Sequence, residues 1–507
     1  MKFTRILCLL LALVTCLGVL ASCGDETGGA TDGGDRVNGS WDGVDFGGTE
    51  VKMAYSNNRV IDETTFPAAD IYTKGPDEVG DNEVFREVLK RNQAAIDALN
   101  IKVTYVPKDL DNLEIPDDVR TIVMTAAKTS PDIYNNDMTG LIRSMINGHL
   151  WNAKNAGEGV KNYFDFTAKG WYTEYIKCST FDQNKYYLFA GDYFIDMIRW
   201  SWLILVNNDL LSDNIKKVPG YQSIKDLYTY VEEGLWDLDM MAEICSNVFV
   251  NGAGGLYDKT EATDKVVGIA INGNFQWMIS ASTGVTVYYL DKDYKPSVMD
   301  NIDQFQLISN KYKKLMEAKG FYDAQGSGTM PAAHFLKRNF VFAQSLLGDM
   351  ESQEMRDFDM DKGVVPLPMW DSFEQDWYHT VVHDQVEIGA ILKSAKQFPA
   401  ASAYMQYLNE NSSDVVKAYY DKGLKYKYTD GDNATKSREM MDIIRGTMDN
   451  PFGFQMMKLC YEQYTGSPAL TGLFLSNNST LSSTFSSEHD SYVWCLNQIM
   501  NKFAAMD

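Results

Sequence analysis

Residues 200–209 read WSWLILVNND, a nearly unbroken apolar run that stops at three polar residues. The run from Trp200 to Val206 predicts a buried β-strand, because short apolar runs bounded by polar residues are typical of strands covered on both faces. An amphipathic helix is expected over residues 223–233. Asp237 predicts the N-cap of the next helix, since its carboxylate can accept backbone N–H groups. Strands that alternate with helices in this way indicate an α/β fold.

The same alternation occurs nearer the N-terminus. Residues 50–55 and 101–105 alternate as strands do, and apolar residues between them recur with the helical period of 3.6 over 84–99. A helix over 117–129 and a short strand over 131–134 follow, which predicts strand–helix–strand units with parallel strands. Ligands of open α/β sheets bind beyond the carboxyl ends of the strands. We therefore expect a ligand near loops 55–58 and 134–137, with Tyr55, Asn57 and Asn135 as candidates.

The first 23 residues have the order of an export signal. Lys2 and Arg5 precede an apolar run over 6–20, and Leu20-Ala21-Ser22-Cys23 ends it. This end resembles the bacterial lipobox, which implies that residues 1–22 are removed and that Cys23 carries lipid on the extracytoplasmic face of the cell membrane. The alternatives are a plain signal peptide or a membrane helix with a chance Cys. The apolar run of about 15 residues is shorter than the roughly 20 that span a bilayer.

Residues 24–48 are rich in Gly, Asp and Thr and contain few large apolar side chains. Such a stretch cannot bury enough surface to repay the entropy of ordering it. We therefore expect residues 23–48 to be the lipidated Cys and a flexible tether, with a coil span of roughly 25–30 Å.

The composition limits the kinds of partner. The chain has 507 residues, 45% of them hydrophobic, and a net charge of −23 with no basic stripe. About 460 residues beyond the tether exceed one compact core, so at least two lobes are expected. Nucleic acids and anionic lipid surfaces need clustered Lys and Arg, so they are poor partners. Four cysteines remain after Cys23, and their spacing favours buried free thiols over a disulfide framework or a zinc site: Cys178, Cys245, Cys460 and Cys495.

Short motifs recur in a fixed order along the chain: 206–210 (VNNDL), 231–239 (VEEGLWDLD), 340–344 (FVFAQ), 363–368 (GVVPLP), 419–428 and 437–444. Each motif is weak alone, but together with the lipobox they cover nearly the whole mature chain. Their order resembles the extracellular solute-binding proteins of ABC importers, of the carbohydrate-binding family 1 type. In the helix-start motif 231–239, Asp237 stands where that family usually has Thr.

The resemblance implies a two-lobed periplasmic-binding-protein-like α/β fold of type II, with several hinge crossings and extra C-terminal helices. One lobe would hold 49–200 plus 340–400, and the other 205–335 plus 405–507. It implies a monomer that closes on a small-molecule solute and that the permease subunits of the importer recognise when closed. No cofactor and no catalysis are implied.

Aromatic side chains near the expected cleft are the best candidates for a carbohydrate ligand, because an aromatic ring stacks on the C–H face of a sugar while Asp and Asn accept its hydroxyls. Trp200 and Trp202 should point the same way, since they are two residues apart on a strand. Each Trp could instead fill the core, and each Asp could cap a helix or lie at the surface. The candidates are Tyr55, Asn57, Asn135, Asp192, Trp200, Trp202, Trp277, Asp349, Trp370, Tyr378 and Asp384.

Metal binding and catalysis find little support. His379 and His383 would share a face only on a helix, whereas residues 378–392 are rich in β-branched residues and predict a strand that separates them by about 13 Å. Asp357, Asp359 and Asp361 lack the later ligands of a calcium loop. No nucleophile elbow, P-loop or dinucleotide fingerprint occurs. The alternatives to an importer receptor are a surface protein that binds or senses glycans without transport, and a polysaccharide-active enzyme. A peptide ligand also remains open.

Overall fold

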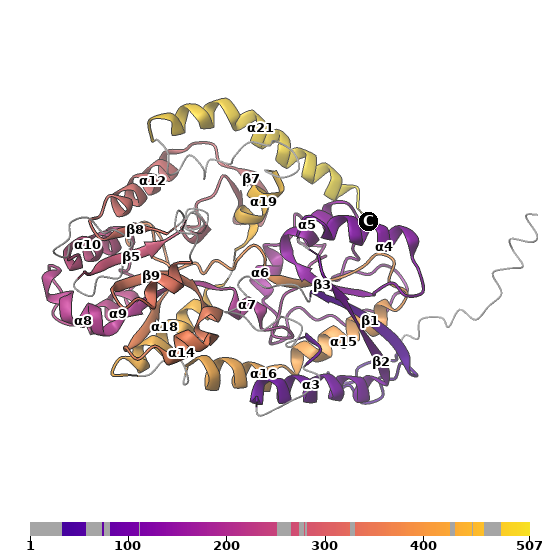
Figure 1. The fold of residues 1–507 in the computed structure, drawn as a ribbon. Helices are drawn as coiled ribbons and strands as arrows, with labels where there is room; N and C mark the ends of the chain where they lie inside the picture. The colour runs from indigo at the N-terminus through magenta and orange to yellow at the C-terminus, as the bar shows by residue number, and fades with distance from the viewer. Residues whose placement is uncertain are drawn as a thin grey trace, which may run out of the picture.

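The computed structural model describes residues 33–56, 73–75, 82–110, 112–250, 265–272, 278, 281–324, 330–425, 431–448, 450–460 and 478–506. Cys23 and the start of the tether lie outside this part, as do two ligand candidates, Asn57 and Trp277. Figure 1 shows two sheets side by side, one in each half of the molecule. We call the half that contains β1, β2 and β3 the first lobe, and the half that contains β5, β8 and β9 the second lobe.

The first lobe is built on a four-stranded sheet of order β11-β3-β1-β2. β1 pairs in parallel with both β2 and β3, as the strand–helix–strand pattern predicted, and β11 is antiparallel to β3. The elements of this lobe are β1 (Thr49–Ser56), α3 (Glu83–Leu99), β2 (Ile101–Lys108), α4 (Ile115–Thr125), β3 (Ile133–Asp137), α5 (Met138–Ile146), α6 (Thr173–Lys177), β11 (Glu387–Ile391) and α15 (Phe398–Glu410).

The second lobe contains a five-stranded sheet of order β10-β4-β9-β5-β8. β4, the apolar run of the opening motif, is buried along its whole length between β10 and β9. The elements are β4 (Trp202–Asn207), α8 (Asn208–Asn214), η1 (Ile215–Lys217), α9 (Ile224–Glu232), α10 (Leu238–Val248), β5 (Val267–Ile271), α12 (Asp303–Met316), β8 (Phe321–Asp323), α13 (Pro331–Phe335), β9 (Phe340–Leu346), η3 (Leu347–Glu351), α14 (Gln353–Asp357), β10 (Lys362–Val365) and α18 (Ala434–Gly446).

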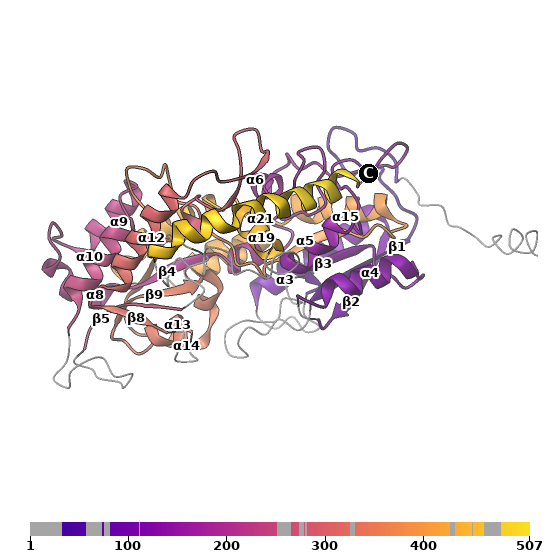
Figure 2. The same ribbon diagram turned by 90° about the horizontal axis from the view of Figure 1, so that it is seen from above.

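Further elements join the two lobes or lie across them. Figures 1 and 2 show the C-terminal helix α21 running over both lobes, and it contacts α12 of the second and α5 of the first. At 27 residues this helix is about 40 Å long. The joining elements are α7 (Asp196–Arg199), the hairpin of β6 (Tyr288–Leu290) and β7 (Pro296–Val298), α16 (Ser413–Val416), the π-helical η4 (Lys417–Leu424), α19 (Phe452–Cys460) and α21 (Asn478–Ala504).

The pairing of the strands corrects the expected lobe boundaries at two places. Residues 340–365 were assigned to the first lobe, but β9 and β10 flank β4 in the second sheet. The residues of α15 beyond 404 were assigned to the second lobe, but this helix packs on α3 and β1. Both predictions were wrong because the sequence of a chain that crosses a hinge several times does not show which sheet its later strands and helices join.

Three local expectations also need correction. Residues 33–48 of the expected tether are packed on the first lobe, where Val44 is 3% and Phe46 0% exposed. The strand expected over 378–392 is confined to β11, because the segment before it forms the hinge. Cys178 and Cys245 are buried free thiols as predicted, whereas Cys495 is disulfide-bonded.

Candidate functional site

Each sheet has an edge at which its parallel strands end, and short segments of the chain connect these two edges. In the first lobe β1, β2 and β3 end on the side where β11 begins. In the second lobe β9 and β5 end on the side where β4 begins. The antiparallel bridge between Ser201 and Val382 lies between these two edges. A ligand that binds beyond the carboxyl ends of either sheet therefore lies between the lobes.

On the first-lobe edge, two neutral polar atoms are buried without a hydrogen-bond partner in the described part of the chain. They are Oγ of Ser56 at the end of β1 and Nδ2 of Asn136 at the end of β3. The last residues paired between β1 and β3 are Tyr55 and Asn135, so Ser56 and Asn136 occupy the next register position of this strand pair. Because buried polar groups in proteins nearly always have a partner, these two atoms indicate a binding position.

On the second-lobe edge, the end of β5 carries an amide pair. Nε2 of Gln344 on β9 donates to Oδ1 of Asn272 at 3.2 Å, and the backbone N–H of Asn272 donates to Oε1 of Gln344 at 3.1 Å. Gln344 was not among our candidates, although it is a polar residue within an otherwise apolar strand. Both lobes thus have amide or hydroxyl groups at their facing edges, and the first edge also carries the buried carboxylates of Asp137 and Glu387.

The hinge between these edges is made of three chain segments that lie side by side. Trp202 donates its backbone N–H to the carbonyl of Val381 at 3.0 Å, and His383 donates to that of Trp200 at 2.9 Å. Thr380 donates to the carbonyl of Thr447 at 2.9 Å. The several hinge crossings that were expected therefore include 200–202, 380–383 and 447–448.

An aromatic stack fills the hinge. The ring of His383 stacks on Trp202 with centroids 5.4 Å apart and meets the edge of Trp200 at 4.9 Å. Both Trp rings thus contact His383, but the common direction was predicted for two residues of one strand, and that premise is wrong: Trp200 is the C-cap of α7, and only Trp202 is on β4. Both are 3% exposed. This burial gives them a packing role at the pivot in the present conformation.

A buried ionic network crosses the hinge beside this stack. Arg199 on α7 pairs with Asp196 at 3.3 Å and with Glu351 of η3 at 3.0 Å. Asp196 in turn accepts the backbone N–H of Glu387 on β11 at 3.0 Å, and Tyr419 of η4 donates to Glu351. The network therefore connects β11 of the first sheet, through α7, to η3, which follows β9 of the second sheet, and to η4.

Asp192 forms an ion pair between the lobes. Its Oδ1 lies 3.3 Å from Nη2 of Arg445 on α18 and accepts the hydroxyl of Tyr172 at 3.1 Å. Burial raises the pKa of Asp192 above its usual value, and Arg445 offsets part of that effect. The carboxylate predicted to face a ligand thus has an interlobe partner within the protein.

The remaining candidates have mixed positions. Asn135 at the first edge accepts from the hydroxyl of Tyr193 and donates to Glu387. Asp384 lies between α5 and the hinge, with Oδ1 2.9 Å from Nδ1 of His383. Tyr55 is the residue before the last of β1, and its ring contacts that of Tyr105.

Three candidates make their contacts within the second lobe. Asp349 caps η3 by accepting from Ser345 and from the backbone of Leu346. Tyr378 donates its hydroxyl to the carbonyl of Val231 on α9, away from the sheet edge. Trp370 is 3% exposed and lies 5.8 Å below Nζ of Lys311.

Two pockets in the described part of the chain do not coincide with the facing edges. One of about 510 Å³ lies on the first lobe between the end of α5 and the end of α21. The other, between α5, Asp384 and α19, leaves no volume for a water-sized molecule and is therefore too small for a usual ligand, whose sites measure roughly 300–1,000 Å³. Among the described residues no cluster of three metal-ligating side chains occurs, and none of their helices is long and apolar enough to cross a bilayer.

Solved structures share this architecture over nearly the whole chain. The cyclic alpha-maltosyl-1,6-maltose binding protein of Arthrobacter globiformis matches with a TM-score of 0.54 and 11% identity, over 90% of this chain and 99% of its own. A sugar transporter protein of Rhizobium etli in an open conformation matches with 0.50 and 12%, over 90% and 100%. This chain has their two-lobed fold. The predicted fold class is thereby confirmed. No protein-family model matches the chain, and no curated protein matches it in sequence.

Proposed function

We propose that the chain is a solute-binding protein that takes a saccharide between its two lobes. The observation that carries the proposal is the pair of buried, unpartnered groups at the first edge, Oγ of Ser56 and Nδ2 of Asn136. Both are neutral, as are the amides of Asn272 and Gln344 on the opposite edge. Neutral donors and acceptors match hydroxyl groups better than they match a charged ligand. The sugar-binding proteins that share the fold support the same class.

We extend the proposal to location and route. The lipobox-like end at Cys23 favours a lipid anchor on the extracytoplasmic face. The two acyl chains of such an anchor bind a membrane stably. A hinged receptor in that place would deliver its solute to the permease subunits of an ABC importer. Two permease genes beside the gene for this chain would support delivery, whereas their absence would favour display or sensing of glycans without transport.

Thermal melting tests the ligand class. The probes are glucose, maltose, maltotriose, lactose, cellobiose and xylobiose, each in millimolar excess. A ligand at about 100 times its Kd adds about 2.7 kcal/mol to the stability of the folded state, which for a chain of this length raises Tm by about 3 °C. Asn136→Ala should abolish the shift, while Asn155→Ala, at an exposed position of the first lobe, should retain it. Hydrolysis of a chromogenic oligosaccharide would instead establish an enzyme and overturn the proposal.

A further inference from the structure

The N-terminal segment 33–48, which we call the strap, is part of the first lobe. Its Phe46 is fully buried and contacts the ring of Tyr163 at 5.8 Å. The backbone N–H of Phe46 donates to the carbonyl of Leu99 at 3.0 Å, and that of Gly48 donates to the carbonyl of Asn100 at 2.7 Å. The strap is thus fixed to the end of α3 by backbone hydrogen bonds and by an aromatic anchor.

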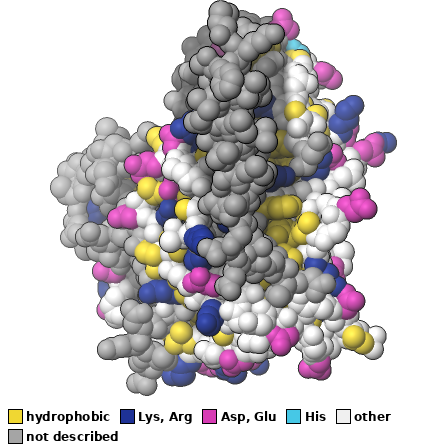
Figure 3. Space-filling model, turned by 90° about the vertical axis from the view of Figure 1, so that its right-hand side faces the viewer, with side chains coloured by type: hydrophobic (Ala, Val, Ile, Leu, Met, Phe, Trp, Pro, Cys, Tyr) yellow, Lys and Arg dark blue, Asp and Glu magenta, His cyan; other side chains and the backbone are white. Residues whose placement is uncertain are grey.

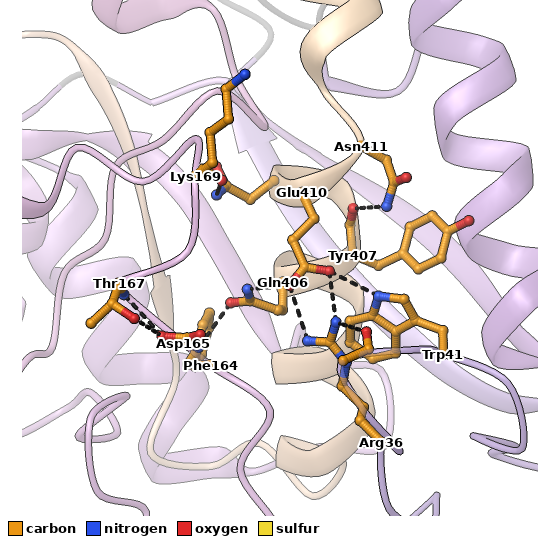
Figure 4. A network of polar contacts seen from close by, with 12 residues as sticks. Arg36, Trp41, Phe164, Asp165, Thr167, Lys169, Gln406, Tyr407, Glu410 and Asn411 are labelled. Carbon is orange, nitrogen blue, oxygen red and sulfur yellow. Dashed lines mark hydrogen bonds and ion pairs between the residues drawn. The ribbon is translucent and has the colours of Figure 1, made fainter.

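A second set of contacts fixes the strap to the end of α15 (Figure 4). The guanidinium of Arg36 makes two hydrogen bonds of 3.0 Å to the carboxylate of Glu410 and lies 4.0 Å from the ring centroid of Trp41. The indole N–H of Trp41 donates to the same carboxylate at 2.9 Å, and Gln406 donates to it at 2.8 Å. Paired bonds of this kind are stronger and more specific than a single ion pair.

The strap is held as far as its first residue. Asp45 donates its backbone N–H to the carbonyl of Gly33 at 3.0 Å. A Cβ at Gly33 would lie 2.4 Å from Cζ of Phe46, so only glycine allows the chain to pass this close to the ring. Gly33 is therefore fixed to the first lobe.

We propose that the strap makes the face of the first lobe at the ends of α3 and α15 the surface that lies against the lipid bilayer. This inference rests on the proposed lipid anchor at Cys23. Nine residues, 24–32, then join the lipid to Gly33. Whatever their conformation, nine residues reach at most about 32 Å, against about 90 Å for the 25 residues of a tether that ends at residue 48. The strap therefore keeps the ends of α3 and α15 closer to the membrane than the longer tether would.

Anchorage through the strap determines which lobe moves relative to the membrane. The first lobe is held at the membrane, and the second lobe is the part that can swing about the hinge. In the described part of the face in Figure 3, which belongs to the first-lobe side of the molecule, Lys, Arg, Asp and Glu side chains are intermixed. Among the described side chains that this view shows, no basic cluster is visible that would attract anionic lipid. We therefore assign the orientation to the strap and not to surface charge.

Energy transfer to labelled vesicles tests the proposal with the full-length lipidated protein. A donor dye is placed at Glu158→Cys on the first lobe or at Lys319→Cys on the second, both at exposed positions. The acceptor is a headgroup dye in phosphatidylcholine vesicles. We expect several-fold higher transfer from position 158 than from 319. The double variant Arg36→Ala, Trp41→Ala should reduce this ratio at least two-fold. The control Lys90→Ala, which removes an exposed ion pair of the same lobe, should leave it unchanged.

Hydrogen exchange supplies an independent readout. In the double variant the amides of residues 44–48 should exchange at least ten-fold faster, while those of β1 should keep their protection. Equal transfer from positions 158 and 319, or a ratio that the double variant leaves unchanged, would overturn the proposal, as would failure of the parent protein to float with the vesicles. A saccharide panel without effect on Tm would reject the solute role and leave this result intact, so the two failures are distinguishable.

Discussion

Asp237 illustrates how a single side chain can be assigned before the structure is known. Its carboxylate accepts the backbone N–H of Met240 at 2.9 Å and so caps α10, and its Oδ2 also accepts from the backbone of Ser372. The cap was predictable because the spacing of a helix start is local. Ser56 and Asn136 were quoted only as parts of loops, because the lack of a partner depends on which strands become neighbours.

Loss of the Asp237 cap should be measurable. Asp237→Ala should lower the free energy of unfolding by about 1 kcal/mol, because one N–H at the helix start loses its partner. Asp237→Asn, which keeps an oxygen acceptor, should cost a few tenths. Urea unfolding followed by circular dichroism measures both variants, and equal losses would contradict the capping role.

Arg199 should be the most sensitive charged residue of the hinge. It is 1% exposed, and its removal leaves Asp196 and Glu351 buried without their cation. Arg199→Ala should therefore cost about 3–5 kcal/mol. The exposed pair of Lys177 and Glu174 gives the control, and Lys177→Ala should cost less than about 1 kcal/mol. A small loss in both variants would show that the network does not support the hinge.

At the scale of elements, the strands and most helices followed from periodicity. β1, α3 and β2 lie where alternation and the 3.6 period placed them. The sheet that each late strand joins was not predictable, because β9 and β10 are apolar and equally suited to either sheet. The strap was also missed. Its low apolar content indicated a coil, but Arg36, Trp41 and Phe46 hold it on a surface that forms only in the folded lobe.

A charged cluster between α10 and α12 should make their packing depend on pH. Nζ of Lys311 lies 2.7 Å from Asp239 and 2.5 Å from Asp371. Burial raises the pKa of each carboxyl, but hydrogen bonds outweigh it, from Lys311 to both, from Lys314 to Asp239 and from the backbone of Phe373 to Asp371, so the net pKa of both lies below the usual 3.8. The stabilisation is therefore present above pH 3.8 and is lost as the pH falls through the lowered values.

Lys311→Met should accordingly reduce stability by about 1 kcal/mol at pH 7, since the groups are partly exposed to water. The difference from the parent should shrink towards zero below the lowered pKa values. Urea midpoints at pH 7 and at successively lower pH measure it, with Lys319→Met at an exposed site as the control. A difference that does not change with pH would mean that Lys311 acts through packing alone.

The C-terminal helix α21 should contribute to the stability of the first lobe. Phe503 is 2% exposed and contacts Phe181 at 5.2 Å and Tyr187 at 5.5 Å. Phe503→Ala should cost about 3–5 kcal/mol through lost contacts and the cavity left behind. Trp494→Ala on the same helix, where the side chain is 50% exposed, should stay within about 0.5 kcal/mol. Thermal melting distinguishes the two.

At the scale of the whole molecule, the hinge segments, the ion pair of Asp192 with Arg445 and the helix α21 all connect the two lobes. The sequence supported two lobes through chain length and motif order, but it could not reveal these connections, which join residues distant in the sequence, such as Asp192 and Arg445, 253 positions apart. A ligand that contacts both edges shifts the equilibrium between the open and closed states only by as much as its affinities for the two states differ. These connections contribute to the free-energy difference between the open and closed states, and the ligand's difference in affinity must exceed it to change which state is populated.

Transfer between dyes on the two lobes, at Glu158→Cys and Lys319→Cys in one protein, tests the central claim most directly. The account predicts that one saccharide of the panel changes the transfer efficiency with a saturating dose dependence, that the same concentrations raise Tm, and that Asn136→Ala removes both effects. If no saccharide of the panel changes either the transfer or Tm, the protein is not the saccharide receptor proposed here.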